Sequence, residues 1–155
     1  MAIILKRMED KQRDLLFRLL QYSLFEESLT DGNEMDEQGW FAYPQFDAYF
    51  TESGYEAYLI CEDEQKKVCG FAMINTQLRS GRTGHSIMEF MILPGCRRKG
   101  IGTAAAHACF SLHRGVWEVA PALGSESARL FWDQAIARYL GTRCEMTNGL
   151  FIFGK

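Results

Sequence analysis

The chain has 155 residues, of which 47% are hydrophobic and 24% are charged, and its formal net charge is −3 at pH 7. This length suits one domain, residues 1–155, with a full hydrophobic core, and the apolar content excludes a disordered chain. The sequence contains no apolar run of membrane-spanning length and no signal-peptide pattern before Glu9 and Asp10. The five cysteines lack metal-site spacing. We therefore expect free thiols, no metal site and a cytoplasmic protein.

The first half of the chain alternates between strand and helix patterns. Leucines recur at three- and four-residue spacing between residues 10 and 25, which predicts an amphipathic helix. The polar stretch 31–39 predicts a loop, and Pro44 in a first helical turn predicts a short second helix. The expected elements are a strand at 2–6, helices at 10–25 and 44–50, and two strands at 55–61 and 68–76 joined by a polar turn.

The second half continues the alternation. Apolar residues on one face support a long last helix, and Asn148-Gly149 is a turn pair that favours a hairpin. The expected elements are a turn at 79–84, strands at 85–93 and 116–120, helices at 100–112 and 125–140, and terminal strands at 143–147 and 150–153.

The segment 87–106 joins a strand to a helix through three consecutive cations at 97–99 and two glycines. The first N–H groups of a helix have no internal partner, and the helix dipole favours negative charge at that end. Gly100 and Gly102 let the backbone come close to a ligand. The segment therefore predicts a site for a polyphosphate.

Two common phosphate motifs fit this segment poorly. A P-loop needs Lys-Ser or Lys-Thr after its second glycine, whereas Ile101-Gly102 follows Gly100. A dinucleotide fingerprint, G-x-G-x-x-A, matches 100–105, but three cations separate its first glycine from the strand. No clear acid closes the next strand, although Glu118 lies inside it.

The pattern Arg97-x-x-Gly100-x-Gly102 after a strand resembles the acyl-CoA pyrophosphate loop of the GCN5-related N-acetyltransferases, the GNAT family. A later segment, Ser125 to Trp132, is similar to the family motif Asn-x-x-Ala-x-x-Phe-Tyr, with Ser in place of Asn and Trp in place of Tyr. The resemblance implies an α/β (α+β) fold with a mixed, mostly antiparallel central sheet flanked by about four helices.

The resemblance also implies acetyl-CoA as the cofactor and acetyl transfer to a primary amine by direct attack in a ternary complex. It implies that a backbone N–H near Ile92 stabilises the oxyanion. The residues it assigns to cofactor binding are Phe90, Met91, Ile92, Arg97, Arg98, Lys99, Gly100, Ile101, Gly102, Thr103, Ser125, Ala128, Phe131 and Trp132.

Glu89 is the candidate general base, because it is a single carboxylate inside an otherwise apolar strand. The alternative is a strand residue that bonds to a neighbouring strand or faces solvent. The usual general acid, a Tyr, is replaced by Trp132, whose indole does not release a proton near neutral pH. That acid is therefore absent unless another group, such as Tyr139, reaches the site.

Charge is unevenly placed along the chain. Residues 19–65 contain no Lys, Arg or His but hold more than half of the 20 acidic residues, with many aromatic residues among them. We expect this stretch to bind a cationic acceptor, with Glu27, Trp40 and Tyr43 as substrate-binding residues. A solvated acidic surface is the alternative. The same charge disfavours nucleic acid as a partner.

Two functions from different classes follow from these patterns. The first is an N-acetyltransferase, a monomer or homodimer, that acts on a small-molecule or peptide amine without nucleic acid or membrane partners. The second is an acyl-CoA-binding regulatory module with weak or no catalysis, which the departures at Ser125 and Trp132 motivate.

Overall fold

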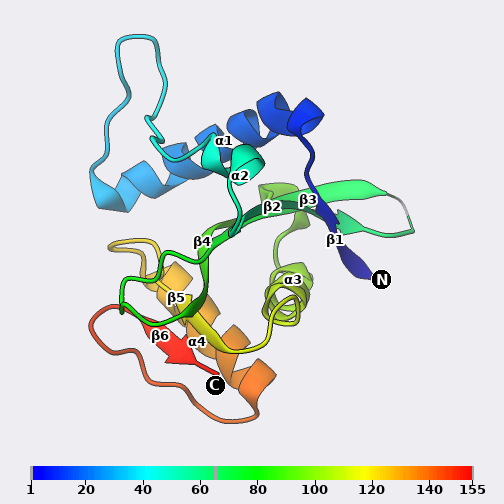
Figure 1. Ribbon diagram of the computed structural model, residues 1–155, viewed down its shortest axis with the longest axis vertical. Helices are drawn as coiled ribbons and strands as arrows, with labels where there is room; N and C mark the ends of the chain where they lie inside the picture. The colour runs from blue at the N-terminus through cyan, green and yellow to red at the C-terminus, as the bar shows by residue number, and fades with distance from the viewer. Residues whose placement is uncertain (1, 65, 155) are drawn as a thin grey trace.

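The computed structural model describes residues 2–64 and 66–154 (Figure 1). Two 3-10 helices, Asp10–Gln12 and Pro94–Cys96, accompany the longer elements. Those elements are β1 (Ile3–Arg7), α1 (Arg13–Asp31), α2 (Ala48–Thr51), β2 (Tyr55–Glu62), β3 (Lys67–Asn75), β4 (Gly84–Ile92), α3 (Ile101–Phe110), β5 (Val116–Val119), α4 (Glu126–Leu140) and β6 (Phe151–Phe153).

The six strands form one sheet in the order β1-β2-β3-β4-β5-β6. All neighbouring pairs are antiparallel except β4 and β5, which are parallel and joined through α3. The predicted fold, a mixed and mostly antiparallel sheet with four helices, is therefore confirmed.

Helices cover both faces of the sheet, with α1 and α2 on one side and α3 and α4 on the other (Figure 1). Leu16 and Leu20 of α1 are fully buried against Phe71 and Met73 of β3. On the opposite face, Phe110 of α3 and Ile136 of α4 belong to a second core. Alternate residues of each strand thus face two different cores, as expected for a sheet covered on both sides.

The first two helices differ from the sequence-based prediction. A 3-10 turn occupies residues 10–12, and α1 continues past Phe25 to Asp31, where Gly32 at φ 77° ends it in the left-handed conformation. The polar residues after Phe25 remain helical because no glycine or proline interrupts them before Gly32. The second helix begins at Ala48, because residues 44–47 form turns.

The predicted strand at 143–147 is wrong. Residues 141–149 are mostly exposed and irregular, and only Thr147 makes an isolated bridge, to Leu150. With few apolar side chains, this segment has no face to bury against a core. The predicted turn is present, since Asn148 and Gly149 have φ of 52° and 77°.

The parallel pairing of β4 with β5 ends early. It runs from Gly84 opposite Val116 to Ile87 opposite Val119, and β5 stops there while β4 continues for five more residues. A bulge at Met88 interrupts the pairing of β4 with β3 at the same point, since Met73 pairs with Glu89 but Ile74 pairs with Ile87. The two strands therefore part at the middle of the sheet.

Among the described residues, no helix combines the length and the apolar character that crossing a membrane requires.

Candidate active site

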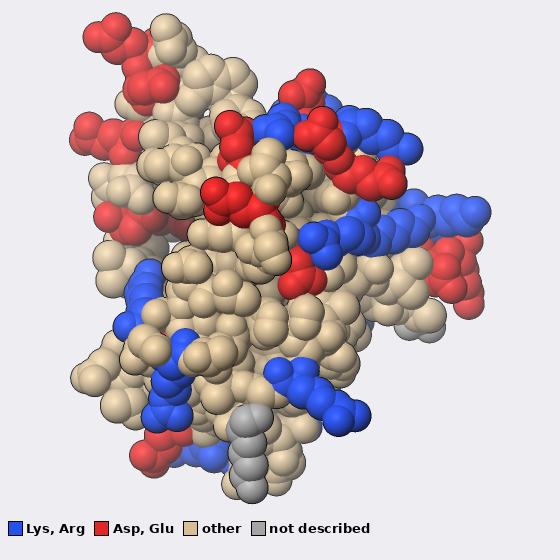
Figure 2. Space-filling model, viewed as in Figure 1, with Lys and Arg blue, Asp and Glu red and all other residues tan. Residues whose placement is uncertain are grey.

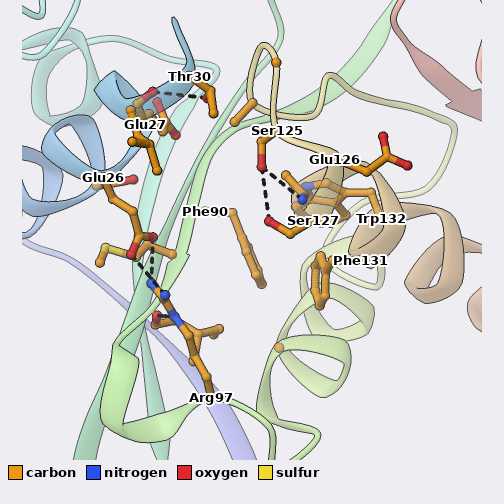
Figure 3. A pocket seen from close by; sticks show the side chains of 18 of the residues that line it. Glu26, Glu27, Thr30, Phe90, Arg97, Ser125, Glu126, Ser127, Phe131 and Trp132 are labelled. Atoms are coloured by element: carbon orange, nitrogen blue, oxygen red, sulfur yellow. Dashed lines mark hydrogen bonds and ion pairs between the residues drawn. The ribbon is translucent and has the colours of Figure 1, made fainter.

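A cavity of about 760 Å³ opens where β4 and β5 part (Figure 3). Glu26 and Glu27 of α1 line one side, Phe90 of β4 forms the back, and Phe131 and Trp132 of α4 line the other side. Most predicted cofactor residues line this cavity, namely Phe90, Met91, Ile92, Arg97, Arg98, Gly100, Gly102, Thr103, Ser125, Ala128, Phe131 and Trp132.

The loop before α3 has the backbone geometry of an anion site. Arg98 and Gly100 both adopt positive φ, 62° and 79°, and Gly100 is the N-cap of α3. Within the part of the chain that the structure describes, the N–H groups from Arg98 to Thr103 donate to no protein acceptor. Unpaired N–H groups at a helix start favour an anion such as a pyrophosphate.

Gly102 is needed for packing as well as for approach of a ligand. A Cβ at this position would lie 2.9 Å from Cε1 of Phe131, closer than side-chain atoms normally come. The absence of a side chain at Gly102 therefore lets the Phe131 ring lie against the first turn of α3.

Three aromatic rings form an apolar wall between β4 and α4. Phe90 and Trp132 meet edge to face at 4.9 Å, and Phe131 stacks on Phe90 at 5.9 Å between ring centroids. Trp132 is 6% exposed, so its indole is part of the core as well as of the cavity. Such a wall suits the apolar part of a long ligand.

Ser125 caps α4. Its hydroxyl oxygen accepts the backbone N–H of Ala128 at 3.2 Å, and its φ and ψ are extended. Serine is as good an N-cap as the asparagine of the family motif, so this replacement keeps the helix start at the cavity.

Arg97 reaches α1 along one side of the cavity (Figure 3). Its guanidinium forms a bidentate ion pair with Glu26, at 3.0 and 2.7 Å, and its Nε donates to the carbonyl oxygen of Ile92 at 2.7 Å (Figure 3). The pair joins α1 to the loop before α3. The Arg97 guanidinium is thus paired with Glu26 and β4. Arg98 is the second cation of this loop that lines the cavity.

Two predicted cofactor residues do not line the cavity. Ile101 is 4% exposed and packs in the core below α3, so only its backbone N–H faces the anion site. Lys99 is exposed, and its ammonium donates to the carbonyl oxygen of Gly95 at 3.4 Å.

A second cavity, of about 790 Å³, adjoins the first and shares Glu27, Phe90 and Trp132 with it. Its lining has four acidic side chains, Glu27, Asp31, Glu89 and Glu126, and two basic ones, Arg79 and Arg129, of which Arg129 forms an ion pair with Glu126. More acidic side chains extend over the loop that follows α1, at the upper left of Figure 2. This cavity has the charge expected for a site that binds a cation.

Burial is the main cause of an unusual pKa at Glu89. It raises the pKa of this carboxyl to about 8, with the negative charge of Glu27 as the next contribution. Tyr43 opposes the shift, because its hydroxyl donates to Oε2 of Glu89 at 3.4 Å. Burial and the nearby Glu89 in turn raise the pKa of the Tyr43 hydroxyl.

The pKa of Glu27 is also raised. Burial raises its pKa to about 7, and the charges of Asp31 and Glu26 add to the effect. Two carboxyls that share a partly buried site thus hold protons near neutral pH, an arrangement typical of groups that exchange protons with a substrate.

The acceptor-side predictions have mixed outcomes. The structure brings Glu27 to both cavities and Tyr43 to Glu89, but Trp40 lies outside both cavities and packs edge to face on Phe17 at 5.2 Å. Tyr139 also lies outside both cavities, since its ring contacts His107 and Phe110 of α3. Neither ring is placed to act on a ligand in these cavities.

Sequence reasoning missed two residues that shape the site. Gln21 binds both backbone groups of Phe41, at 2.8 and 2.9 Å, and so fixes the loop that carries Tyr43. Glu26 holds Arg97. Glu26 lies beyond the predicted end of the helix, whereas Gln21 lies inside the predicted helix, so the helix length bears on Glu26 alone.

A family comparison agrees with this geometry. Residues 21–133, more than half of the chain, match the model of the acetyltransferase (GNAT) family. The chain is a GNAT acetyltransferase. No curated protein matches it in a sequence search.

Solved structures of other acetyltransferases share its fold. Aminoglycoside acetyltransferase AAC(6')-Ib in complex with coenzyme A has a TM-score of 0.66 at 14% identity, over 99% of this chain and 95% of that one. Spermidine N-acetyltransferase from Vibrio cholerae, with CoA and spermine, has a TM-score of 0.61 at 13% identity, over 86% and 79%. A GNAT acetyltransferase from Staphylococcus aureus Mu50 has a TM-score of 0.62 at 12% identity, over 99% of both chains.

The Gly102 contact predicts a specific loss of ligand binding. In Gly102→Ala the added Cβ pushes the Phe131 ring into the cavity, so the Kd for CoA should rise about tenfold or more, as expected for an overpacked site. The overpacking should also lower the free energy of unfolding, and the better helix propensity of Ala offsets part of that loss. Gly95→Ala is the control, since a Cβ there meets no atom within 4 Å. Calorimetry that finds equal CoA affinity in both variants would contradict the placement.

The raised pKa of Glu89 predicts that replacing this residue with Gln increases the free energy of unfolding at high pH. A folded-state pKa of about 8, above the ordinary 4.5, means that the native state holds a proton that the unfolded chain releases, so wild-type stability falls as pH rises through this window. The free energy of unfolding of Glu89→Gln should match that of the wild type near pH 5 and exceed it by roughly 1 to 3 kcal/mol near pH 9.

Urea unfolding at several pH values measures this difference. Glu37→Gln, on the exposed loop, provides the control and should show no such trend. If Glu89→Gln is no more stable than the wild type at any of these pH values, the Glu89 carboxyl is not held in its protonated form.

Proposed function

We propose that this acetyltransferase uses acetyl-CoA to acetylate a primary amine on a small molecule with more than one positive charge. The observation that carries the proposal is the meeting of two cavities at Phe90 and Trp132, one with an anion-binding helix start and one with several carboxylates. CoA supplies the anion, and an ammonium complements the carboxylates. We further propose that residues 1–155 act as one domain in the cytoplasm.

The cofactor assignment follows the chemistry of the first cavity. The free N–H groups of 98–103 and the Arg98 side chain suit the pyrophosphate, and the aromatic wall suits the pantetheine arm. The thioester then reaches the boundary between the two cavities. Neighbours of the same fold bind CoA in their solved complexes, which supports the assignment.

The acceptor assignment follows from charge. Glu27, Asp31 and Glu89 line the second cavity, and a bound cation favours the ionised forms of Glu27 and Glu89, so these carboxylates can pair with more than one ammonium group. An acceptor with two or more ammonium groups leaves one group paired with carboxylates while the other reacts. Neighbours were solved with spermine and with kanamycin, both polyamines, which agrees with this class.

The proposed reaction needs a proton acceptor before the amine attacks. Glu89 takes a proton from the ammonium, directly or through water, and the ammonium itself favours the ionised form of Glu89 when it binds. The neutral nitrogen bonds to the thioester carbon while a backbone N–H near Ile92 stabilises the oxyanion. The C–S bond then breaks, CoA leaves as thiolate, and the nitrogen's second proton goes to the thiolate through solvent.

Trp132 has no acid role in this scheme. Its indole packs between Phe90 and Phe131 and lacks an acidic proton. Because a thiolate is a stable leaving group, water is a sufficient acid. The buried position of Trp132 supports a wall function instead.

Acetyl-CoA turnover against spermidine, kanamycin and a neutral amino sugar tests the proposal. The polyamines should react, with kcat/KM rising between about pH 6 and 9 as Glu89 ionises. Glu89→Gln should lower turnover by about 10² to 10⁴ near neutral pH and recover partly at high pH, where free amine is abundant. Glu27→Gln should shift the apparent pKa downward, since it removes the like charge beside Glu89.

Glu37→Gln is the control for general loss of negative charge, because Glu37 is exposed on the loop. Tight CoA binding with no turnover on any amine would favour the alternative, a CoA-binding module without catalysis. Turnover that prefers the neutral acceptor would contradict the assigned substrate class.

A further inference from the structure

Three side chains with metal-ligand chemistry meet at the end of the sheet away from both cavities. Glu56 comes from the start of β2, His85 from the start of β4, and His113 from the turn after α3. Each offers one donor atom, and these atoms all lie within 4.8 Å of one another. None of the three residues lines either cavity.

We propose that Glu56, His85 and His113 form a binding site for a divalent transition-metal ion, with Zn²⁺ as its best occupant. Two imidazoles and one carboxylate are a donor set that zinc accepts in proteins, and three protein ligands leave a fourth position for water. The site lies at the surface, since the His113 side chain is 31% exposed, so an ion can enter from solvent.

An unsatisfied atom is the observation that points to a ligand. Nδ1 of His85 is buried without a hydrogen-bond partner, and among the residues that the structure describes it is the only buried side-chain nitrogen or oxygen in this state. A buried polar atom without a partner is costly, and such an atom often marks a place where an ion binds. A metal bound at Nδ1 of His85 would give this atom the partner that it lacks.

Three side chains fix the position of the Glu56 carboxylate. Oε1 accepts the hydroxyl of Tyr58 and lies 3.5 Å from the Arg7 guanidinium, while Oε2 is 2.7 Å from Nε2 of His113. The carboxylate of Glu56 and the imidazole of His113 are therefore already in contact. Oriented outer partners of this kind strengthen metal ligands.

Metal binding requires one local change. The rings of His85 and His113 are stacked, with centroids 3.8 Å apart and planes 3° apart. A metal lies in the plane of each imidazole that binds it, so one ring must turn about its Cβ–Cγ bond. The partial exposure of His113 gives that ring the room to turn. We therefore expect binding to break the stack and to join β2, β4 and the turn before β5.

Zinc titration of untagged, metal-free protein tests the proposal. Calorimetry should give one ion per chain, and the melting temperature should rise by roughly 5 to 10 °C at about 100 times the Kd. Glu56→Gln, His85→Ala and His113→Ala should each weaken binding by more than about tenfold. His107→Ala and Cys144→Ser are matched controls and should bind normally, since His107 is the remaining histidine and Cys144 the one cysteine that is not buried.

Nuclear magnetic resonance of the wild-type protein keeps the test independent of variant folding. Zn²⁺ should shift the imidazole nitrogen resonances of His85 and His113 and leave those of His107 unchanged. Absence of one-to-one binding, equal affinity in the ligand variants, or a response confined to His107 or the thiols would each overturn the site. Acetyl transfer is not part of this readout, so the result is separate from that of the proposed function.

Discussion

The early end of the β4–β5 pairing is the constraint on which the site depends. Proline has no backbone N–H, so Pro121, two residues beyond β5, cannot extend the ladder, and the chain turns away to begin α4 at Glu126. On the other strand, the bulge at Met88 changes the direction of β4 at the same level. The two strands diverge, and backbone that would otherwise lie inside a sheet becomes one wall of a cavity.

Opposite charges then occupy the two sides of this opening. The loop before α3 supplies cations and unpaired N–H groups, whereas the end of α1 supplies carboxylates. Burial raises the pKa of Glu27 and of Glu89, and the charges of neighbouring carboxylates add to the effect. The ion pair between Arg97 and Glu26 joins the two sides, so the helix that positions the acids also positions the phosphate loop.

Short sequence motifs predicted most of the residues that the structure brings together around the first cavity. Arg97 to Thr103 and Ser125 to Trp132 are each continuous, and turn and helix-start geometry follows from local residue type. Most strands were also predictable, because their apolar runs are bounded by polar turns. The strand at 143–147 failed because it was inferred from the turn pair beside it rather than from an apolar face of its own.

Contacts between distant segments were not predictable in the same way. Glu89 with Tyr43, Arg97 with Glu26, and the cluster of Glu56 with two histidines each join residues that only the folded sheet brings together. Trp40 was predicted to bind substrate because it is an aromatic residue among acidic ones, but it packs on Phe17 outside both cavities. Composition indicates a stretch of chain, and tertiary packing decides which of its side chains face the cavities.

The most direct test is a crystal structure of the enzyme with CoA and spermidine bound together. The account predicts that the pyrophosphate accepts N–H groups from residues 98–103 and that the CoA sulfur lies beside Phe90 and Trp132. It also predicts a spermidine nitrogen on the Glu89 side of that sulfur. A CoA molecule bound away from the opening between β4 and β5, or a spermidine that does not contact Glu27, Asp31 or Glu89, would contradict it.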